Sequence, residues 1–257
     1  MLEYMRSYSA KYLPLLLPAM LILYQPGADV YANEDYSSAR MQMVNEIRDM
    51  VRETRSYIGK DSLNERVIQA MARVPRHEFV PDTIRSYAYE NRALPIGEEQ
   101  TISQPYIVAL MTDLADIDKN ATVLEVGTGS GYQAAVLAEL AGHVYTIEII
   151  DSLGKRARAT LERLGYRNVT VRIGDGYHGW PEHAPFDAIL VTAAPEQVPQ
   201  PLIEQLKPGG KLVIPVGRPF GGQSLQVLEK NAAGEVVIKD VLPVGFVPLT
   251  GDHEKSN

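Results

Sequence analysis

Apolar and amphipathic stretches alternate along the middle of the chain, and this alternation predicts strands that are separated by helices. Four apolar runs predict strands at residues 122–126, 143–147, 169–173 and 186–192. The stretches between and after them predict helices at residues 133–140, 151–164 and 199–206. Nearly continuous apolar strands joined by helices are typical of a mostly parallel sheet covered on both faces, so we expect a Rossmann-like, doubly wound α/β fold.

The pattern changes toward the C-terminus. A Pro208-Gly-Gly210 turn leads into a predicted strand at residues 211–216. Residues 224–230 and 236–244 then predict two strands around a turn at residues 231–234, which is the pattern of an antiparallel hairpin. We therefore expect the mostly parallel sheet to end in a C-terminal antiparallel hairpin.

Upstream of the sheet the spacing of apolar residues predicts helices. One face of a first helix carries Val44, Ile47, Val51 and Ile58. Ser62 and Glu65 form a capping-box pattern for a second helix, which Pro75 ends. The loop that follows, residues 75–81, provides Phe79 and Val80 as expected buried anchors.

A further helix is expected to begin at Gln104 and Pro105, after an irregular segment at residues 95–103. Ser103 is well placed as the N-cap of this helix, and proline is tolerated in a first helical turn. We expect three parts beyond the first 32 residues: a helical N-terminal extension or cap at residues 33–94, a main domain at residues 95–251 and a tail at residues 252–257.

The first 32 residues have the pattern of a secretory signal. Arg6 and Lys11 precede a short apolar run, and small residues flank a cleavage point after Ala32. The run is too short and too interrupted by proline to span a bilayer comfortably. A misassigned start, with translation from Met41 or Met43, is the alternative explanation of this segment.

Composition excludes several kinds of site. The 257 residues include 45% hydrophobic and 22% charged side chains, which is an ordinary globular composition. The formal net charge of −7 disfavours nucleic acid as a partner, because nucleic-acid readers usually carry a basic face. The absence of cysteine excludes disulfides and thiolate nucleophiles. We expect no metal, because ligand spacing is lacking among His77, His143, His178, His183 and His253.

The main chemical signal is a glycine-rich turn between the first predicted strand of the sheet and the helix after it. Gly127, Gly129 and Gly131 stand at alternate positions. Glycines there let a ligand approach the backbone, and the helix N-terminus offers free N–H groups. The third glycine comes one residue too early for a dinucleotide fingerprint. Glu125, ahead of the loop, repels a pyrophosphate and suits a cationic ligand such as S-adenosylmethionine, which carries an ammonium and a sulfonium.

Two further acids end the next strands of the predicted sheet. Glu148 follows the glycine loop by about 20 residues, where a carboxylate accepts hydrogen bonds from ribose hydroxyls. Asp175 lies between Gly174 and Gly176, where an adenine amino group would need an acceptor. The alternatives are a solvated strand-end acid for Glu148 and an ordinary Asp-Gly turn for Asp175.

Seven motifs together resemble the protein-L-isoaspartate O-methyltransferase family over roughly residues 60–251. The glycine loop alone indicates only a class I methyltransferase, whereas TISQP and FVPL are far more specific. The motifs are PRHEFVP (75–81), TISQP (101–105), LEVGTGSGY (124–132), GDG (174–176), FDAILVTAAP (186–195), LKPGG (206–210) and FVPL (246–249).

The resemblance implies S-adenosylmethionine as the cofactor and an active-site role for Ser103. The cofactor-binding residues are then Glu125, Gly127, Gly129, Gly131, Glu148, Asp175 and Gly176. The substrate-binding residues are then Ser103, Gln104 and Val247. Two departures stand out: Glu99 lies where the bacterial pattern commonly has glycine, and residues 1–40 have no counterpart in the usual family member.

The implied reaction methylates the free α-carboxylate of L-isoaspartyl residues in damaged proteins and starts their return to aspartate. A carboxylate with a pKa of about 4 is already ionised at neutral pH, so no general base is required. Catalysis can then rest on the alignment of the reacting atoms. Ser103 at a helix N-terminus would orient the anion, and the alternative is that Ser103 only caps its helix.

Other functions stay open at this point. One is a methyltransferase for another carboxylate or for nucleic acid, and another is an exported, non-catalytic module that recognises altered peptides. We expect a monomer without nucleic-acid partners and without stable membrane association once any signal segment is removed. A cytoplasmic location is favoured because S-adenosylmethionine is made there, and export through residues 1–32 is the alternative.

Overall fold

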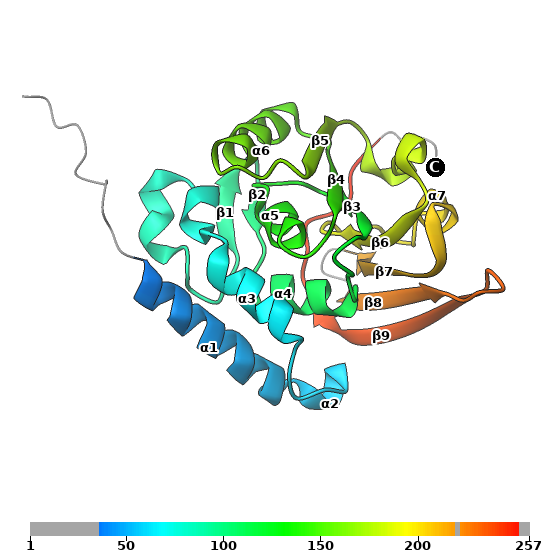
Figure 1. Cartoon of the computed structure of the whole chain (residues 1–257), viewed down its shortest axis with the longest axis horizontal. Helices are drawn as coiled ribbons and strands as arrows, with labels where there is room; N and C mark the ends of the chain where they lie inside the picture. The colour runs from blue at the N-terminus through cyan, green and yellow to red at the C-terminus, as the bar shows by residue number, and fades with distance from the viewer. Residues whose placement is uncertain (1–35, 219–221, 252–257) are drawn as a thin grey trace, which may run out of the picture. The chain divides into compact units, whose positions relative to one another are not determined.

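The computed structural model describes residues 36–218 and 222–251, so the expectations for residues 1–32 and 252–257 lie outside the described residues. The main element is a seven-stranded sheet in the order β5-β4-β3-β6-β7-β8-β9 (Figure 1). Neighbours from β5 to β7 run parallel, whereas β8 and β9 are antiparallel. The predicted Rossmann-like, mostly parallel sheet with a C-terminal hairpin is confirmed. The strands are β3 (Thr122–Val126), β4 (His143–Glu148), β5 (Val169–Ile173), β6 (Phe186–Val191), β7 (Leu206–Arg218), β8 (Gly222–Lys230) and β9 (Val236–Val244).

Helices precede the sheet and connect its parallel strands. The α-helices are α1 (Ser37–Glu53), α2 (Arg55–Ile58), α3 (Glu65–Arg73), α4 (Pro105–Leu114), α5 (Tyr132–Ala138), α6 (Asp151–Arg163) and α7 (Gln200–Glu204). Short 3₁₀ helices are η1 (Arg76–Phe79), η2 (Asp82–Tyr87), η3 (Gly176–His178) and η4 (Pro181–His183). No helix in the described part of the chain is long and apolar enough to cross a membrane.

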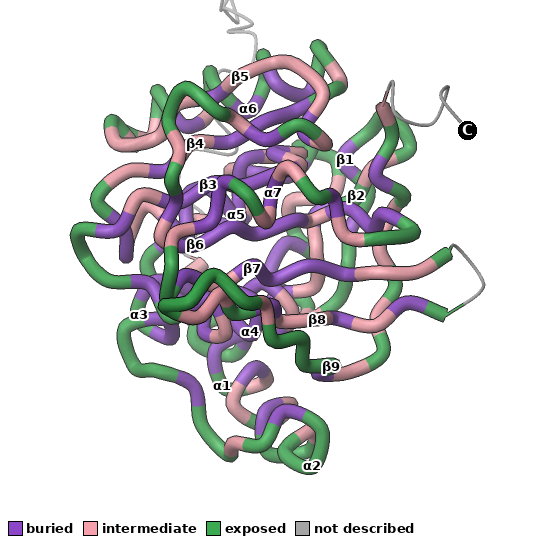
Figure 2. Tube along the Cα trace, turned by 90° about the vertical axis from the view of Figure 1, so that its right-hand side faces the viewer, coloured by how far each residue is buried: buried purple, intermediate pink, exposed green. Residues whose placement is uncertain are grey.

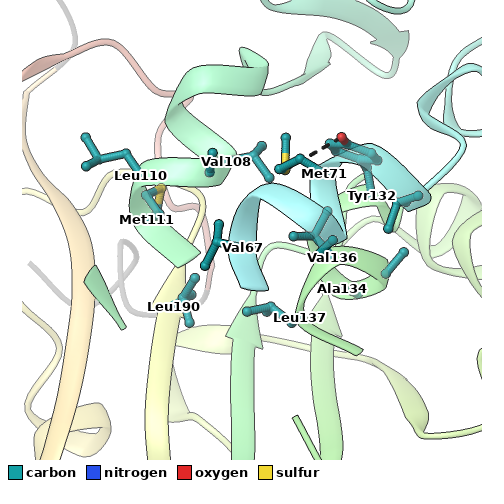
Figure 3. Close-up of a cluster of buried hydrophobic side chains, with 14 of the residues drawn as sticks. Val67, Met71, Val108, Leu110, Met111, Tyr132, Ala134, Val136, Leu137 and Leu190 are labelled. Carbon is teal, nitrogen blue, oxygen red and sulfur yellow. Dashed lines mark hydrogen bonds between the residues drawn. The ribbon is translucent and has the colours of Figure 1, made fainter. Parts of the chain in front are cut away.

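Successive residues of the central strands belong to two different hydrophobic cores, as expected for side chains that alternate between the faces of a sheet. Val123 and Leu190 belong to a core that includes residues of α1, α3, α4 and α5. Figure 3 shows part of this core, where Leu190 lies near labelled residues of α3, α4 and α5. Leu124 and Ile189 belong to a second core that includes Leu202 of α7. The central strands β3 and β6 are therefore buried along nearly their whole length, while the edge strand β9 is largely exposed (Figure 2).

The N-terminal helices form as expected, with one correction at a helix start. The predicted apolar face of the first helical region is buried: Val44, Ile47, Val51 and Ile58. The capping box of Ser62 and Glu65 is wrong, because α3 begins at Glu65 and its N-cap is Asn64. The Asn64 side chain accepts a hydrogen bond from the Arg66 backbone N–H at 2.9 Å, which satisfies an otherwise unpaired amide of the first turn.

The segment predicted to be irregular at residues 95–103 is mostly a hairpin of β1 (Leu94–Gly97) and β2 (Gln100–Ile102). Its two-residue turn is formed by Glu98 and Glu99, whose φ angles are 54° and 57°. Two positive φ angles are the signature of a tight hairpin turn that usually contains Asn-Gly. The prediction failed because glutamate carries no turn signal, and Glu99 occupies a position that favours glycine.

The turn predicted at residues 208–210 is also different in the structure, because these residues lie within β7. The pairing of β6 with β7 jumps from Phe186–Leu206 to Ala188–Lys211, so the extra residues form a bulge. Gly209 adopts a φ of 82° in this bulge. A glycine pair therefore bends a continuous strand where the local sequence suggested a break.

Candidate active site

The glycine loop lies between the end of β3 and the start of α5 and has a backbone that other residues could not adopt easily. Gly127, Gly129 and Gly131 have φ angles of 97°, 53° and 90°. A Cβ atom on Gly127 would lie 2.4 Å from Oγ1 of Thr192. The Thr192 hydroxyl donates to the Gly127 carbonyl at 2.6 Å, and the Gly127 amide donates to the Ile147 carbonyl at 2.8 Å. The loop is thus fixed from both neighbouring strands.

Glu148 at the end of β4 is held by the backbone on both carboxylate oxygens. Its Oε2 accepts from the Gly129 amide at 2.7 Å, and its Oε1 accepts from the Ile150 amide at 2.9 Å. The residue is only 5% exposed. Each carboxylate oxygen keeps a second lone pair, so Glu148 can still accept hydrogen bonds from two hydroxyls of a ligand.

Asp175 and Gly176 follow β5 at the same edge of the sheet. Asp175 is the N-cap of η3, and its Oδ1 accepts from the Tyr177 amide at 2.9 Å. A Cβ atom on Gly176 would lie 2.4 Å from Cγ1 of Val126, so glycine is required for this close approach to β3. The cap accounts for the hydrogen bond that Oδ1 of Asp175 accepts. The contact of Asp175 with an adenine amino group stays a prediction.

Glu125 lies beneath the glycine loop and is fully buried. Thr146 Oγ1 donates to Glu125 Oε2 at 2.5 Å, and Thr128 Oγ1 lies 2.6 Å from the same threonine oxygen. Burial raises the pKa of Glu125 to about 8, the Thr146 hydrogen bond opposes this shift, and Glu148 adds to it. Glu125 does not line the cavity above the loop, and its predicted role in cofactor binding stays a prediction.

Two cavities meet beside the glycine loop. The first is lined by residues 126–130, 147–150, Gly176, 100–103 and 247–250, among others. The second is lined by residues 91–93, 103–104, 106–107 and 242–247, by Met50 of α1 and by its C-cap Thr54, among others. Four residues line both cavities and are here called the junction: Thr101, Ser103, Thr192 and Val247.

Ser103 connects β2 to α4 and reaches the junction from one side. Gln104, not Ser103, is the N-cap of α4, so the capping prediction for Ser103 is wrong, while Pro105 opens the helix as expected. The Gln104 side chain donates to the Asn91 carbonyl at 2.9 Å. The amide of Tyr106 donates to Asn91 Oδ1 at 3.0 Å, so a single asparagine fixes the start of the helix.

Val247 reaches the junction from the opposite side, on the segment after β9. The Ala194 amide donates to the Val247 carbonyl at 2.8 Å, and the Leu249 amide donates back to the Ala194 carbonyl at 2.9 Å. One residue earlier, the Gln223 side-chain amide binds the backbone of Phe246 twice, at 2.6 and 3.0 Å. This segment is therefore fixed along its backbone.

Sequence reasoning missed several residues of the site. Thr192 could have been found, because it follows a parallel strand at the edge where such sheets bind ligands. Arg76, whose Nη2 donates to the Ser103 carbonyl at 2.8 Å, lies inside a recognised motif that gave no hint of this contact. Asn91 and Gln223 lie outside every recognised motif, and their roles appear only in three dimensions.

Several histidines and tyrosines pack against other aromatic rings in the described residues. His77 stacks on Tyr36 at 4.1 Å, and His183 stacks on Tyr145 at 3.9 Å. Tyr132 is buried and also lines the first cavity. The described residues contain no group of three or more histidine and acidic side chains that could hold a metal ion.

Comparison with known proteins agrees with this site. The family model for protein-L-isoaspartate(D-aspartate) O-methyltransferase (PCMT) matches residues 46–254. Protein-L-isoaspartate O-methyltransferase 2 of Syntrophobacter fumaroxidans is 57% identical over 96% of this chain and 99% of its own length. Protein-L-isoaspartate O-methyltransferase 2 of Polaromonas sp. strain JS666 is 64% identical over 82% of this chain and all of its own length.

Solved structures show the same fold. A protein-L-isoaspartate O-methyltransferase structure is 30% identical, with a TM-score of 0.72, and the match covers 83% of this chain and 66% of that one. A putative protein-L-isoaspartate O-methyltransferase from Plasmodium falciparum, solved with S-adenosyl-L-homocysteine, has a TM-score of 0.65 at 22% identity. Its match covers 85% of this chain and 99% of that one, and at this identity it supports the fold alone.

Proposed function

We propose that this chain, which belongs to the protein-L-isoaspartate(D-aspartate) O-methyltransferase family, methylates the free α-carboxylate of L-isoaspartyl residues in damaged proteins with S-adenosylmethionine. The observation that carries the proposal is the junction between the two cavities. A methyl donor in the first cavity and a peptide in the second would meet only there. All four residues that line it belong to the motifs of the resemblance, and Ser103 and Val247 come from the two most specific of these motifs.

The chemistry of the residues that line the first cavity suits S-adenosylmethionine. The glycine loop has positive φ angles, and its residues Gly127, Thr128 and Gly129 line this cavity. Glu148 and Gly176 line this cavity, so Glu148 would accept the ribose hydroxyls and Gly176 would lie against the adenine. Asp175 itself does not line the cavity, and its contact with the adenine stays a prediction. When bound, the cofactor supplies a methyl group attached to a positively charged sulfur.

The acceptor side of the reaction needs orientation more than proton transfer. An α-carboxylate with a pKa of about 4 is ionised at neutral pH, so no residue has to remove a proton. Ser103 can donate its hydroxyl hydrogen to this carboxylate, and the N-terminus of α4 adds a favourable dipole of about 0.3–1 kcal/mol. The role of the chain would then be to position the carboxylate oxygen for the methyl group.

The second cavity supports a peptide as the acceptor. Its walls combine backbone of residues 242–247 with the segment of residues 91–93, and the fixed backbone near Val247 suits an extended chain. The net charge of −7 makes nucleic acid an unfavourable alternative acceptor.

The test uses labelled S-adenosylmethionine and two peptides that differ only in isoaspartate or aspartate at one position. We expect methyl incorporation into the isoaspartyl peptide alone. Equal labelling of both peptides, or labelling of neither, would exclude the proposed function. Calorimetry with S-adenosylhomocysteine then distinguishes a methyltransferase for another acceptor from a non-catalytic binding module. The methyltransferase would bind S-adenosylhomocysteine, whereas the module need not bind it.

We also infer that the protein works as a monomer in the cytoplasm, where its cofactor is made. Residues 1–32 make export the alternative, since they have the pattern of a signal. N-terminal sequencing of protein purified from its own cells distinguishes the two. A mature start after Ala32 would contradict the cytoplasmic assignment.

A further inference from the structure

Arg76 carries a buried charge close to the junction without lining either cavity. Its side chain is completely buried, and among the described residues it forms no ion pair with a carboxylate. Its Nε donates to the Ala88 carbonyl at 2.7 Å, and its Nη2 donates to the Ser103 carbonyl at 2.8 Å. The guanidinium also lies over the ring of Tyr132, 4.7 Å from the ring centre.

A buried guanidinium with only neutral partners is expected to lower the stability of the folded protein. Removing a cation from water is unfavourable unless other groups compensate, and burial lowers the pKa of Arg76 to about 10. A well-packed apolar side chain in such a position is often no less stable than a buried charge. Stability therefore does not account for the presence of Arg76. Its contacts indicate instead which groups it holds in place.

The contacts of Arg76 reach both sides of the junction. Ser103 lines both cavities and faces the proposed acceptor. Tyr132 follows the glycine loop directly and lines the first cavity. A planar guanidinium with donors in a fixed fork can set the relative position of these two groups, whereas the single, flexible ammonium of lysine cannot.

We propose that Arg76 is a positioning residue for methyl transfer, which rests on the proposed function of the junction. It fixes the carbonyl of Ser103 and thereby the orientation of the Ser103 hydroxyl. Asn91 fixes the next residues, Gln104 and Tyr106, so Arg76 supplies the constraint on Ser103 itself. Arg76 touches neither reactant, and its effect is on the alignment of the acceptor carboxylate.

The experiment compares Arg76→Lys with Arg66→Lys. Arg66 also donates to two backbone carbonyls, of Ile117 at 3.1 Å and Leu140 at 3.0 Å, but lines neither cavity of the site. The measurements are kcat and KM for an isoaspartyl peptide, calorimetric affinity for S-adenosylhomocysteine, and thermal unfolding with that ligand at saturation. For Arg76→Lys we expect kcat to fall about 10- to 100-fold, because small displacements of reacting groups have effects of this size.

The expected pattern separates positioning from general damage. The affinity of Arg76→Lys for S-adenosylhomocysteine should stay within about 3-fold of the wild-type affinity, a difference of under about 1 kcal/mol. The kcat of Arg66→Lys should equal that of the wild type. Equal losses of kcat in the two variants would overturn the proposal. So would a loss of cofactor affinity that matches the loss of kcat, or failure of Arg76→Lys to fold even with saturating ligand. A wild-type protein that labels no isoaspartyl peptide would instead show that the proposed function is wrong, and the inference would fall with it.

Discussion

The two sides of the junction are constructed differently. The cofactor side consists of the glycine loop and Glu148 at the ends of parallel strands, and its hydrogen bonds are largely made by backbone groups. The acceptor side consists of residues 101–107 and 242–247, and the side chains of Arg76 and Gln223, which lie outside these segments, hold them through hydrogen bonds. Substitutions on the cofactor side should therefore change binding of the cofactor, and substitutions on the acceptor side should change the rate of transfer.

The largest expected effect is on the acceptor side. Ser103→Ala should lower kcat for an isoaspartyl peptide about 100-fold, because the acceptor carboxylate loses its orienting hydroxyl. Cofactor affinity should be retained, as measured by calorimetry. Ser152→Ala is the control, since Ser152 donates to Glu98 at 2.8 Å on the exposed surface. Lost cofactor affinity in Ser103→Ala would mean that Ser103 belongs to the other side.

On the cofactor side, Gly127→Ala should weaken S-adenosylhomocysteine binding at least about 10-fold. A loss of about 1.4 kcal/mol in binding free energy corresponds to a tenfold weaker affinity. The new Cβ would crowd Thr192 Oγ1 and displace the loop. Gly165→Ala is a matched control, because Gly165 has a φ of 84° with no atom within 4 Å of an added Cβ. Both variants incur left-handed strain of about 1–2 kcal/mol, so their difference isolates the effect of crowding. Equal affinities would contradict the assignment of the loop.

A third effect concerns stability and the buried acid beneath the loop, and leaves the transfer reaction aside. The pKa of Glu125 is raised from 4.5 to about 8, so the folded state binds its proton more tightly than the unfolded state. Protonated Glu125 contributes fully to the free energy of unfolding below pH 4.5, and this contribution is lost as pH rises through about 8. Between these two values the free energy of unfolding should fall by about 1.4 kcal/mol per pH unit. Glu125→Gln should remove that part of the pH dependence.

The measurement is denaturant unfolding of wild type and Glu125→Gln from pH 5 to 9. The free energy of unfolding of the wild type should fall with pH relative to the variant. Glu53→Gln, at an exposed position of α1, should follow the wild-type curve. Parallel curves for wild type and Glu125→Gln would show that Glu125 is ionised in the folded protein throughout this range.

The smallest expected effect is at the hairpin that leads into the acceptor side. Glu99→Gly should raise Tm by about 1–3 °C, because glycine relieves left-handed strain of about 1–2 kcal/mol and loses part of this gain in the unfolded chain. Glu99 has a φ of 57°. The control Gln100→Gly lies in β2 and should lower Tm. A lower Tm for Glu99→Gly would show that the glutamate contributes more than its backbone strain costs.

The same difference between the two sides explains what the sequence could predict. Strands with continuous apolar residues and a loop with three glycines carry their signal locally, so the parallel sheet and the cofactor side were predictable. The hairpin of Glu98 and Glu99 was missed because its turn residues are atypical. On the acceptor side, Arg76 meets Ser103 across 27 residues and Gln223 meets Phe246 across 23, and no local pattern encodes such pairs.

The backbone hold on Glu148 has a consequence for engineering this protein. Because the amides of Gly129 and Ile150 orient both carboxylate oxygens, this carboxylate is aimed by main chain and does not rely on the identity of neighbouring side chains. Libraries that seek new methyl acceptors can therefore randomise residues 92–93 and 242–245 without retuning the donor site, while Asn91, which holds the start of α4, stays unchanged. The acceptor side can therefore be varied while the cofactor side is kept.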